Sequence, residues 1–248
     1  MPTDSNFLTV LPIYNEEASV DTVLDLVVKH AQDVLVVDDG STDGTSALLA
    51  KRSDVKVLDH GKNRGYGAAL ISGFQYAADN GYQFVVTIDC DGQHEPQRIQ
   101  DFVSRIENSG ADIVSGSRYL EDFGEDTAAP VERRKINQII TETIGRVMQI
   151  ELTDAFCGFK AYRVEALQRL ELTELGYAMP LELWVQAACH KLKVVEVAVP
   201  RIYLDENRSF GELLDNADTR LNYYHEVINA ALKRLPESCD KLGEQRVG

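Results

Sequence analysis

The chain contains the sequence FVVTIDCDGQH at residues 84–94, where a short apolar run gives way to acidic residues. Its first part, Phe84–Asp89, has the length and the β-branched composition of a buried strand. Four similar runs occur at Phe7–Pro12, Val34–Asp38, Val55–Asp59 and Ile113–Ser117. Continuous apolar runs of this kind are typical of strands covered on both faces, as in a parallel sheet.

Between these strands, three sets of apolar residues recur at intervals of three and four, which is the spacing of an amphipathic helix. They are Val20, Val23, Leu24, Val27 and Ala31; Leu70, Phe74, Ala77 and Ala78; and Ile99, Phe102, Val103 and Ile106. The alternation predicts an α/β fold with a Rossmann-like, mostly parallel sheet flanked by helices. In such sheets, ligands bind beyond the carboxyl ends of the strands.

The alternation is looser after residue 118. The expected elements are a mobile acidic loop at Glu121–Pro130, a long helix carrying the apolar residues from Ile136 to Met148, a helix at Pro180–Leu192, a strand at Val194–Val199 and a last helix at Phe210–Arg234. No linker divides the chain. We therefore expect one domain over residues 1–235, followed by a polar tail at residues 236–248.

The composition restricts the kinds of ligand that the protein binds. The chain has 248 residues with 25 Lys+Arg and 40 Asp+Glu, a net charge of −15. This charge argues against a protein that holds nucleic acid through bulk positive charge. An anionic ligand must be held locally, by helix N-termini, by a metal or by a few placed arginines.

Cysteine usage and hydropathy bear on the compartment. The four cysteines share no CxxC spacing and no paired pattern, so we expect neither zinc nor a disulfide framework. The N-terminal sequence MPTDSNFLTVLP has no basic segment followed by an apolar stretch, so we expect no secretory signal. No uncharged apolar run approaches the ~20 residues that span a bilayer. The simplest expectation is a protein of the reducing cytoplasm.

Two acids dominate the end of the quoted stretch. Asp89 and Asp91 are two residues apart, so extended backbone sends both carboxylates to the same side while Cys90 points into the packing. With the amide oxygen of Gln93 they offer hard oxygen ligands suited to Mg²⁺ or Mn²⁺. The alternative is a polar turn in which Asp91 caps the segment that follows.

Polar motifs also follow the first two strands. PIYNEE occupies residues 12–17 and DDGSTDGT residues 38–45. Tyr14 could stack on a nucleoside base and Glu16 could hydrogen-bond to it, while acids at a strand tip accept from a base N–H or a ribose hydroxyl. The alternative interpretation makes these residues turn, cap and first-turn residues of helices.

Five motifs together, in the order PIYNE, VVDDGSTDGT, NRGYGAAL, DCDGQH and GSR, resemble the family 2 glycosyltransferases of GT-A fold. Their order and spacing are more specific than any one of them. RRKIN at 133–137, DAFCGFKAYR at 154–163 and GYAMPLE at 176–182 resemble the polyprenol-phosphate glycosyltransferase branch, which includes dolichol-phosphate mannose synthases.

The resemblance implies roles for three groups of residues. Asp89, Asp91 and Gln93 would hold the metal on the donor diphosphate, and the nucleotide-sugar would contact Pro12, Tyr14, Glu16, Asp38, Asp39, Asp89 and Asp91. The acceptor phosphate would be held by Arg118, Arg134 and Arg208, with Asp89, Asp91 and Arg118 as the catalytic residues. The chain departs from the family at two positions on the acceptor side. It has Leu213-Leu214 where the family often has Ser-Lys, and it has Gln138 where the family often has a serine.

The implied reaction is an inverting, metal-dependent transfer of a sugar from GDP-mannose or a UDP-hexose to a polyprenyl phosphate. A phosphate acceptor is already anionic at neutral pH, whereas a hydroxyl acceptor needs a general base. Glu182 and Asp154 are the carboxylates that could serve as that base. Their alternative roles are structural, as an arginine partner and a turn residue respectively.

Three other functions remain open at this stage. They are a soluble glycosyltransferase with a hydroxyl acceptor, a nucleotide-sugar-binding protein without turnover, and a nucleotidyltransferase, although PIYNEE lacks the Gly-rich, lysine-bearing phosphate loop of that class. A lipid acceptor would require weak, peripheral contact with the inner face of a membrane. That contact would involve the cluster Arg133–Lys135, apolar loop residues or a membrane partner.

Overall fold

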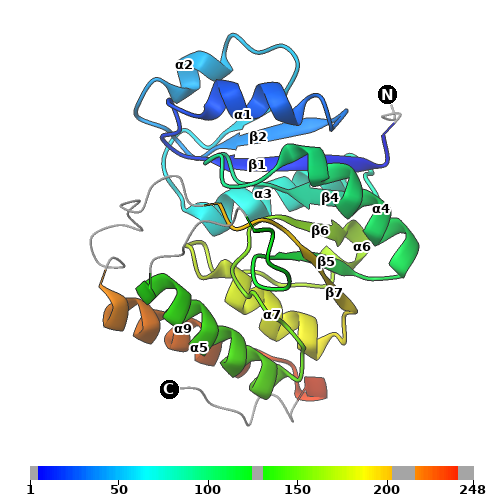
Figure 1. Ribbon diagram of the computed structural model, residues 1–248, viewed down its shortest axis with the longest axis vertical. Coiled ribbons are helices and arrows are strands. Elements are labelled where there is room, and N and C mark those ends of the chain that lie inside the picture. The colour runs from blue at the N-terminus through cyan, green and yellow to red at the C-terminus, as the bar shows by residue number, and fades with distance from the viewer. Residues whose placement is uncertain (1–4, 125–130, 203–215, 240–248) are drawn as a thin grey trace.

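The computed structural model describes residues 5–124, 131–202 and 216–239 (Figure 1). Within them, seven strands form one sheet in the order β3-β2-β1-β4-β6-β5-β7. The strands are β1 Phe7–Ile13, β2 Val34–Asp38, β3 Lys56–Asp59, β4 Phe84–Thr87, β5 Ile113–Ser117, β6 Lys160–Arg163 and β7 Val194–Ala198. Strands predicted from apolar runs are thus present, with small shifts at their ends.

Strand β6 is the exception to the parallel arrangement. It lies between β4 and β5 and runs antiparallel to both, whereas the other neighbouring pairs are parallel. This strand was not predicted, because KAYR is short and has a charge at each end. Lys160 is nevertheless only 2% exposed, and its ammonium lies 5.6 Å from the centre of the Trp184 ring.

Helices cover both faces of the sheet. They are α1 Val20–Val27, α2 Thr45–Leu49, α3 Tyr66–Asp79, α4 Ile99–Ser109, α5 Val131–Met148, α6 Val164–Leu167, α7 Met179–Cys189 and α9 Ala217–Lys233, with 3-10 turns η1 Pro96–Arg98 and η2 Glu237–Cys239. One core contains the apolar sides of α1 and α4, and a second contains those of α3, α5, α7 and α9. The helices α5, α7 and α9 lie together at the end of the molecule opposite α1 and α2 (Figure 1).

The spacing rules placed the early helices correctly because their apolar residues reach the core. Val20, Leu24 and Val27 of α1 are fully buried, as are Ile99 and Phe102 at α4. The last predicted helix is described from Ala217, and its N-cap Asn216 accepts the Thr219 N–H at 2.9 Å. The start of that prediction, most of the predicted acidic loop and residues 240–248 lie outside the described residues.

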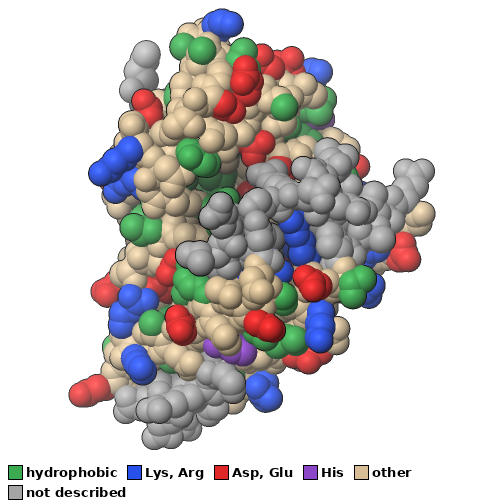
Figure 2. Space-filling view, turned by 90° about the vertical axis from the view of Figure 1, so that its left-hand side faces the viewer, with side chains coloured by type: hydrophobic (Ala, Val, Ile, Leu, Met, Phe, Trp, Pro, Cys, Tyr) green, Lys and Arg blue, Asp and Glu red, His purple; other side chains and the backbone are tan. Residues whose placement is uncertain are grey.

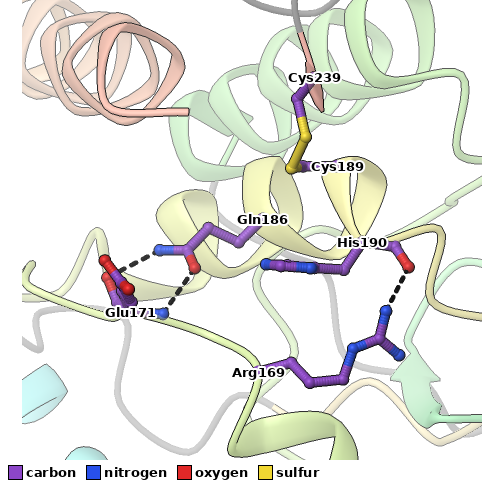
Figure 3. Close-up of a disulfide and its surroundings, with 6 residues drawn as sticks. All are labelled: Arg169, Glu171, Gln186, Cys189, His190 and Cys239. Atoms are coloured by element: carbon purple, nitrogen blue, oxygen red, sulfur yellow. Dashed lines mark hydrogen bonds between the residues drawn. A yellow bond between two sulfur atoms is a disulfide. The ribbon is translucent and has the colours of Figure 1, made fainter. Parts of the chain in front are cut away.

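The expectation of no disulfide was wrong. Cys189 at the end of α7 and Cys239 in η2 are bonded, with their Cα atoms 5.4 Å apart (Figure 3). Fifty residues separate them, so no local spacing reveals the pair, and it forms because α9 packs against α7. Cys90 and Cys157 are buried and are not part of a disulfide. The cysteines therefore no longer support a reducing compartment.

The end of α7 that carries the disulfide is also tied to the preceding segment. Gln186 exchanges two hydrogen bonds with the backbone of Glu171, at 2.7 and 2.8 Å. Arg169 donates to the carbonyl oxygen of His190 at 2.8 Å (Figure 3).

Among the helices in the described ranges, none combines the length and the apolar character needed to cross a membrane.

Candidate functional site

The loops that follow β1 and β2 are joined by hydrogen bonds at one edge of the sheet. Asn15 adopts a positive φ of 56°. In this conformation its N–H donates to Ser41 Oγ at 3.0 Å and its Oδ1 accepts the Thr42 N–H at 2.8 Å. The Glu16 N–H donates to Thr45 Oγ1 at 2.9 Å. The motifs PIYNEE and DDGSTDGT, 26 residues apart in the chain, therefore form one surface beyond the strands.

Three predicted nucleoside-binding residues lie on or under this surface. Tyr14 is 41% exposed, as a residue that stacks on a base must be. Glu16 is half-buried and accepts a hydrogen bond from the Ser19 hydroxyl at 2.9 Å. Pro12 is buried in β1 opposite Val37 of β2. Pro12 therefore lies beneath the surface that these loops form.

Asp38 and Asp39 are almost completely buried, with 1% and 2% exposed. Asp38 accepts hydrogen bonds from the Ser41 N–H at 2.9 Å and the Ser46 hydroxyl at 2.5 Å. The two acids hold the backbone of the surrounding loops, so any contact with a nucleoside would come in addition to a structural role.

The carboxylate of Asp39 has contacts at both oxygens. It accepts the Arg64 N–H at 3.0 Å and the Gly65 N–H at 2.8 Å. His60 Nδ1 lies 2.7 Å from Asp39 Oδ1, while His60 Nε2 lies 2.9 Å from Ser72 Oγ. Asp39 thus fixes the loop that enters α3.

Asp89 and Asp91 follow β4 at the same edge. The Tyr66 hydroxyl donates to Asp89 Oδ1 at 3.0 Å, and His94 Nε2 lies 3.4 Å from Asp89 Oδ2. Asp91 Oδ1 accepts the Gln93 N–H at 3.0 Å, so the predicted turn contact of Asp91 is present. Burial and the charge of Asp89 raise the pKa of Tyr66 well above its usual range. The phenol therefore stays protonated and acts as the donor.

The donor set at this point fits a hard divalent cation. The two carboxylates and the amide oxygen of Gln93 are hard oxygen donors of the kind that Mg²⁺ and Mn²⁺ prefer. A Cβ at Gly158 would overlap the Asp89 carboxylate, so the chain approaches this acid as closely as glycine permits. In the part of the chain that the structure describes, no three His, Cys, Asp or Glu residues form a complete metal site. A cation held here would need ligands from a phosphate and water.

Asp154 and Arg118 form a buried ion pair. Arg118 Nε and Nη2 donate to the two Asp154 oxygens at 2.7 and 3.0 Å. The carboxylate also accepts from Asn137 Nδ2 at 2.9 Å and from the Phe156 N–H at 3.1 Å. Burial alone would raise the pKa of Asp154, but the Arg118 charge and these hydrogen bonds outweigh burial and lower the pKa to about 2. A carboxylate of this pKa is a poor general base.

Glu182 is engaged in a similar way. It is 1% exposed and accepts the N–H groups of Thr173 and Glu174, each at 2.7 Å. Arg234 of the last helix donates to it at 2.8 Å. The structure therefore gives Glu182 the predicted arginine-partner role, while Asp154, predicted as a turn residue, is an arginine partner as well.

Three arginines converge on one tyrosine. The guanidinium carbons of Arg118, Arg134 and Arg201 lie 5.8, 6.0 and 5.7 Å from the centre of the Tyr119 ring. A cavity of about 330 Å³ opens beside them, lined by Tyr119, Arg134, Asn137, Gln138, Thr141, Glu142, Leu152 and Thr153. The third predicted phosphate ligand, Arg208, lies outside the described residues.

This local positive charge contrasts with the rest of the molecule. On the face drawn in Figure 2, acidic side chains gather over the upper part, the end where Figure 1 places α1 and α2. Arg118 and Arg134 were expected here from the motifs, whereas Tyr119 and Arg201 were not. Tyr66 and His94 belong to the motifs NRGYG and DCDGQH, but only the fold brings their side chains to Asp89.

Comparison with known proteins identifies the family of the chain. Residues 9–171 match the sequence model of the family described as glycosyl transferase family 2. The chain is 32% identical over 203 residues to polyprenol monophosphomannose synthase of Mycolicibacterium smegmatis, covering 77% of this chain and 76% of that protein. It is 30% identical over 221 residues to undecaprenyl-phosphate mannosyltransferase of Micrococcus luteus, covering 85% and 90%.

A solved structure is similar over the whole chain. Glucosyl-3-phosphoglycerate synthase of Mycobacterium tuberculosis, crystallised with Mn²⁺, UDP and phosphoglyceric acid, has a TM-score of 0.69 at 19% identity, covering 99% of this chain and 81% of that one. This similarity confirms the predicted GT-A fold. The family match covers well over half of the chain and the motifs lie at one edge of the sheet. The protein is therefore a glycosyltransferase that belongs to glycosyl transferase family 2.

Proposed function

We propose that the protein transfers a hexosyl group from GDP-mannose or a UDP-hexose to a polyprenyl phosphate, with a divalent metal and with inversion at the anomeric carbon. The names of the two relatives, polyprenol monophosphomannose synthase and undecaprenyl-phosphate mannosyltransferase, support a polyprenyl-phosphate acceptor. A single in-line displacement would invert the configuration.

The observation that carries the choice of acceptor is the ion pair of Asp154 with Arg118. Both carboxylates that were candidates for a general base, Asp154 and Glu182, are buried and hydrogen-bonded to structural partners. A hydroxyl acceptor needs a base to remove its proton, whereas a phosphate oxygen is already negatively charged at neutral pH. The site is therefore better suited to a phosphate.

On the donor side, Asp89, Asp91 and Gln93 would hold Mg²⁺ or Mn²⁺. When bound, the cation would act as a Lewis acid and stabilise the charge that develops on the leaving diphosphate. Tyr14 would stack on the base and Glu16 would hydrogen-bond to it, while Asp38 and Asp39 would hold the loops around them. These assignments follow the family resemblance, and the exposure of Tyr14 supports the role given to its ring.

On the acceptor side, Arg118 and Arg134 would bind the phosphate, since planar guanidinium groups suit phosphate oxygens. Arg208 would join them, as the family resemblance implies. Val131, at the start of α5 and next to the basic cluster Arg133–Lys135, is 82% exposed. An exposed apolar residue beside cations favours weak, peripheral attachment to an anionic membrane.

The test is a transfer assay that compares acceptors. Purified protein is incubated with GDP-mannose, UDP-glucose or UDP-N-acetylglucosamine and with undecaprenyl phosphate in detergent or a simple sugar alcohol. We expect transfer from one donor to the lipid phosphate, lost on addition of a chelator and restored by Mn²⁺. Transfer to the alcohol alone would contradict the acceptor assignment. Donor binding without transfer to either acceptor would favour a nucleotide-sugar-binding protein without turnover.

A further inference from the structure

Two glycines determine the position of Tyr66. Gly65 has a φ of +109°, and a Cβ there would overlap the carbonyl oxygen of Leu175. A Cβ at Gly67 would lie 2.5 Å from the carbonyl oxygen of Glu174. The first turn of α3 therefore packs directly against the backbone of residues 174–175. Only glycine allows so close an approach at these two positions.

The segment that contacts Tyr66 is held in place by hydrogen bonds. Glu182 accepts the N–H groups of Thr173 and Glu174 at 2.7 Å each. Tyr177, from the same segment, stacks on the Tyr66 ring with centroids 5.6 Å apart and an interplanar angle of 18°. The motif GYAMPLE and the residues before it thus form a support for the ring of Tyr66.

The hydroxyl of Tyr66 reaches Asp89. Its distance of 3.0 Å to Asp89 Oδ1 is that of an ordinary hydrogen bond, whereas His94 Nε2 lies 3.4 Å from Oδ2. The terminal torsion of an aspartate is soft and roughly two-fold, so a donor on one oxygen decides the plane of the carboxylate. Tyr66 gives the stronger of these two contacts.

We propose that Tyr66 is a positioning residue that holds the Asp89 carboxylate in the orientation required to bind the metal–diphosphate group. The inference rests on the proposed function, in which Asp89 is a metal ligand. Partners that orient a metal-binding side chain are worth about 10- to 100-fold in metal affinity. The glycines and Glu182 then act through Tyr66 and not on the substrate.

The test measures Mn²⁺ affinity in the presence of GDP or UDP by calorimetry, with no turnover required. We expect Tyr66→Phe to weaken Mn²⁺ binding about 10-fold. Tyr82→Phe is the matched control, because its buried hydroxyl contacts Lys56 Nζ at 3.0 Å and not Asp89. This control should leave Mn²⁺ affinity unchanged.

Two further variants show whether the effect passes through Asp89. Residues that act on one another give non-additive effects, so Asp89→Asn with Tyr66→Phe should bind Mn²⁺ no more weakly than Asp89→Asn alone. Tyr177→Ala removes a ring that is 42% exposed and should produce a smaller loss than Tyr66→Phe. It provides the same test if Tyr66→Phe folds poorly.

Wild-type affinity in Tyr66→Phe would overturn the inference while leaving the proposed function intact. A loss of equal size in Tyr82→Phe would also overturn it, because the effect would then be one of general stability. Failure of the wild-type protein to bind Mn²⁺ with any nucleotide would refute the metal-dependent function, and this inference with it.

Discussion

Replacing Asp154 by asparagine separates its structural role from a role as a general base. The substitution keeps the shape of the side chain and removes its charge. Arg118, of which 16% of the side chain is exposed, would lose the partner to which its Nε and Nη2 donate. The change therefore removes a negative charge that lies directly against a largely buried guanidinium.

The size of the effect follows from the pKa of the carboxyl group, which falls from 3.8 to about 2 in the folded protein. Each pKa unit corresponds to about 1.4 kcal/mol, so the folded state favours the ionised form by about 2 kcal/mol. Removing one partner of a buried pair costs about 3–5 kcal/mol in other proteins. We expect Asp154→Asn to lower the free energy of unfolding by about 2 to 5 kcal/mol at pH 7.

The dependence on pH gives a second, independent check. Because the folded-state pKa of Asp154 lies below the unfolded value, its contribution is complete above about pH 4 and is lost as the pH falls toward 2. Urea unfolding of wild type and Asp154→Asn should give a constant difference in stability from pH 7 to about pH 5. About half of the contribution should be lost by pH 3.

A difference that stays constant down to pH 2, or that widens as the pH falls from 7 to 5, would refute the reasoning. It would mean that the Asp154 carboxyl keeps a pKa near or above its ordinary range, and Asp154 would again be a candidate for the general base of a hydroxyl acceptor. Asn137→Ala is a useful companion, because it removes one donor to Asp154 but leaves the ion pair in place. It should lower the stability less than Asp154→Asn does.

Three other outcomes are expected. Changing Cys189 and Cys239 to serine should lower the free energy of unfolding by about 4 kcal/mol, since the bond closes a loop of 50 residues. If the wild-type protein gives equal melting curves with and without reductant, the bond is absent. Asp91→Ala should abolish sugar transfer, and loss of the hydrogen bond from the Gln93 N–H should lower stability by about 1 kcal/mol. Residual activity near wild type would exclude a metal-binding role. Arg134→Ala should raise the KM for the phosphate acceptor by roughly 10-fold or more. The affinity for the donor, measured by calorimetry, should stay unchanged. A weaker donor affinity would instead indicate that Arg134 binds the donor diphosphate.

Local patterns were sufficient for most of the sheet and its helices. Apolar β-branched runs such as Val34–Asp38 form strands wherever both faces are covered, and the spacing of Val20, Leu24 and Val27 selects a helix regardless of its neighbours. The acids after β1, β2 and β4 were correctly expected at one edge, because parallel strands carry their carboxyl ends to the same side.

Strand β6 and the disulfide depended on partners that are distant in the chain. The four residues of β6 contain too little apolar surface to mark a strand, and they form one because β4 and β5 supply hydrogen bonds on both sides. Cys189 and Cys239 meet because α7 and α9 pack together. Neither relationship leaves a trace in the local spacing of residues.

The sequence by itself determined that the protein is an acidic α/β glycosyltransferase with acids beyond its strands, because periodicity and ordered motifs are properties of consecutive residues. Only the tertiary structure decided what individual acids do. Asp154 could have been a base or a partner, and its ion pair with Arg118 from another part of the chain makes it a partner. The charge state and orientation of a side chain depend on groups that folding brings near, and sequence order does not specify that distance.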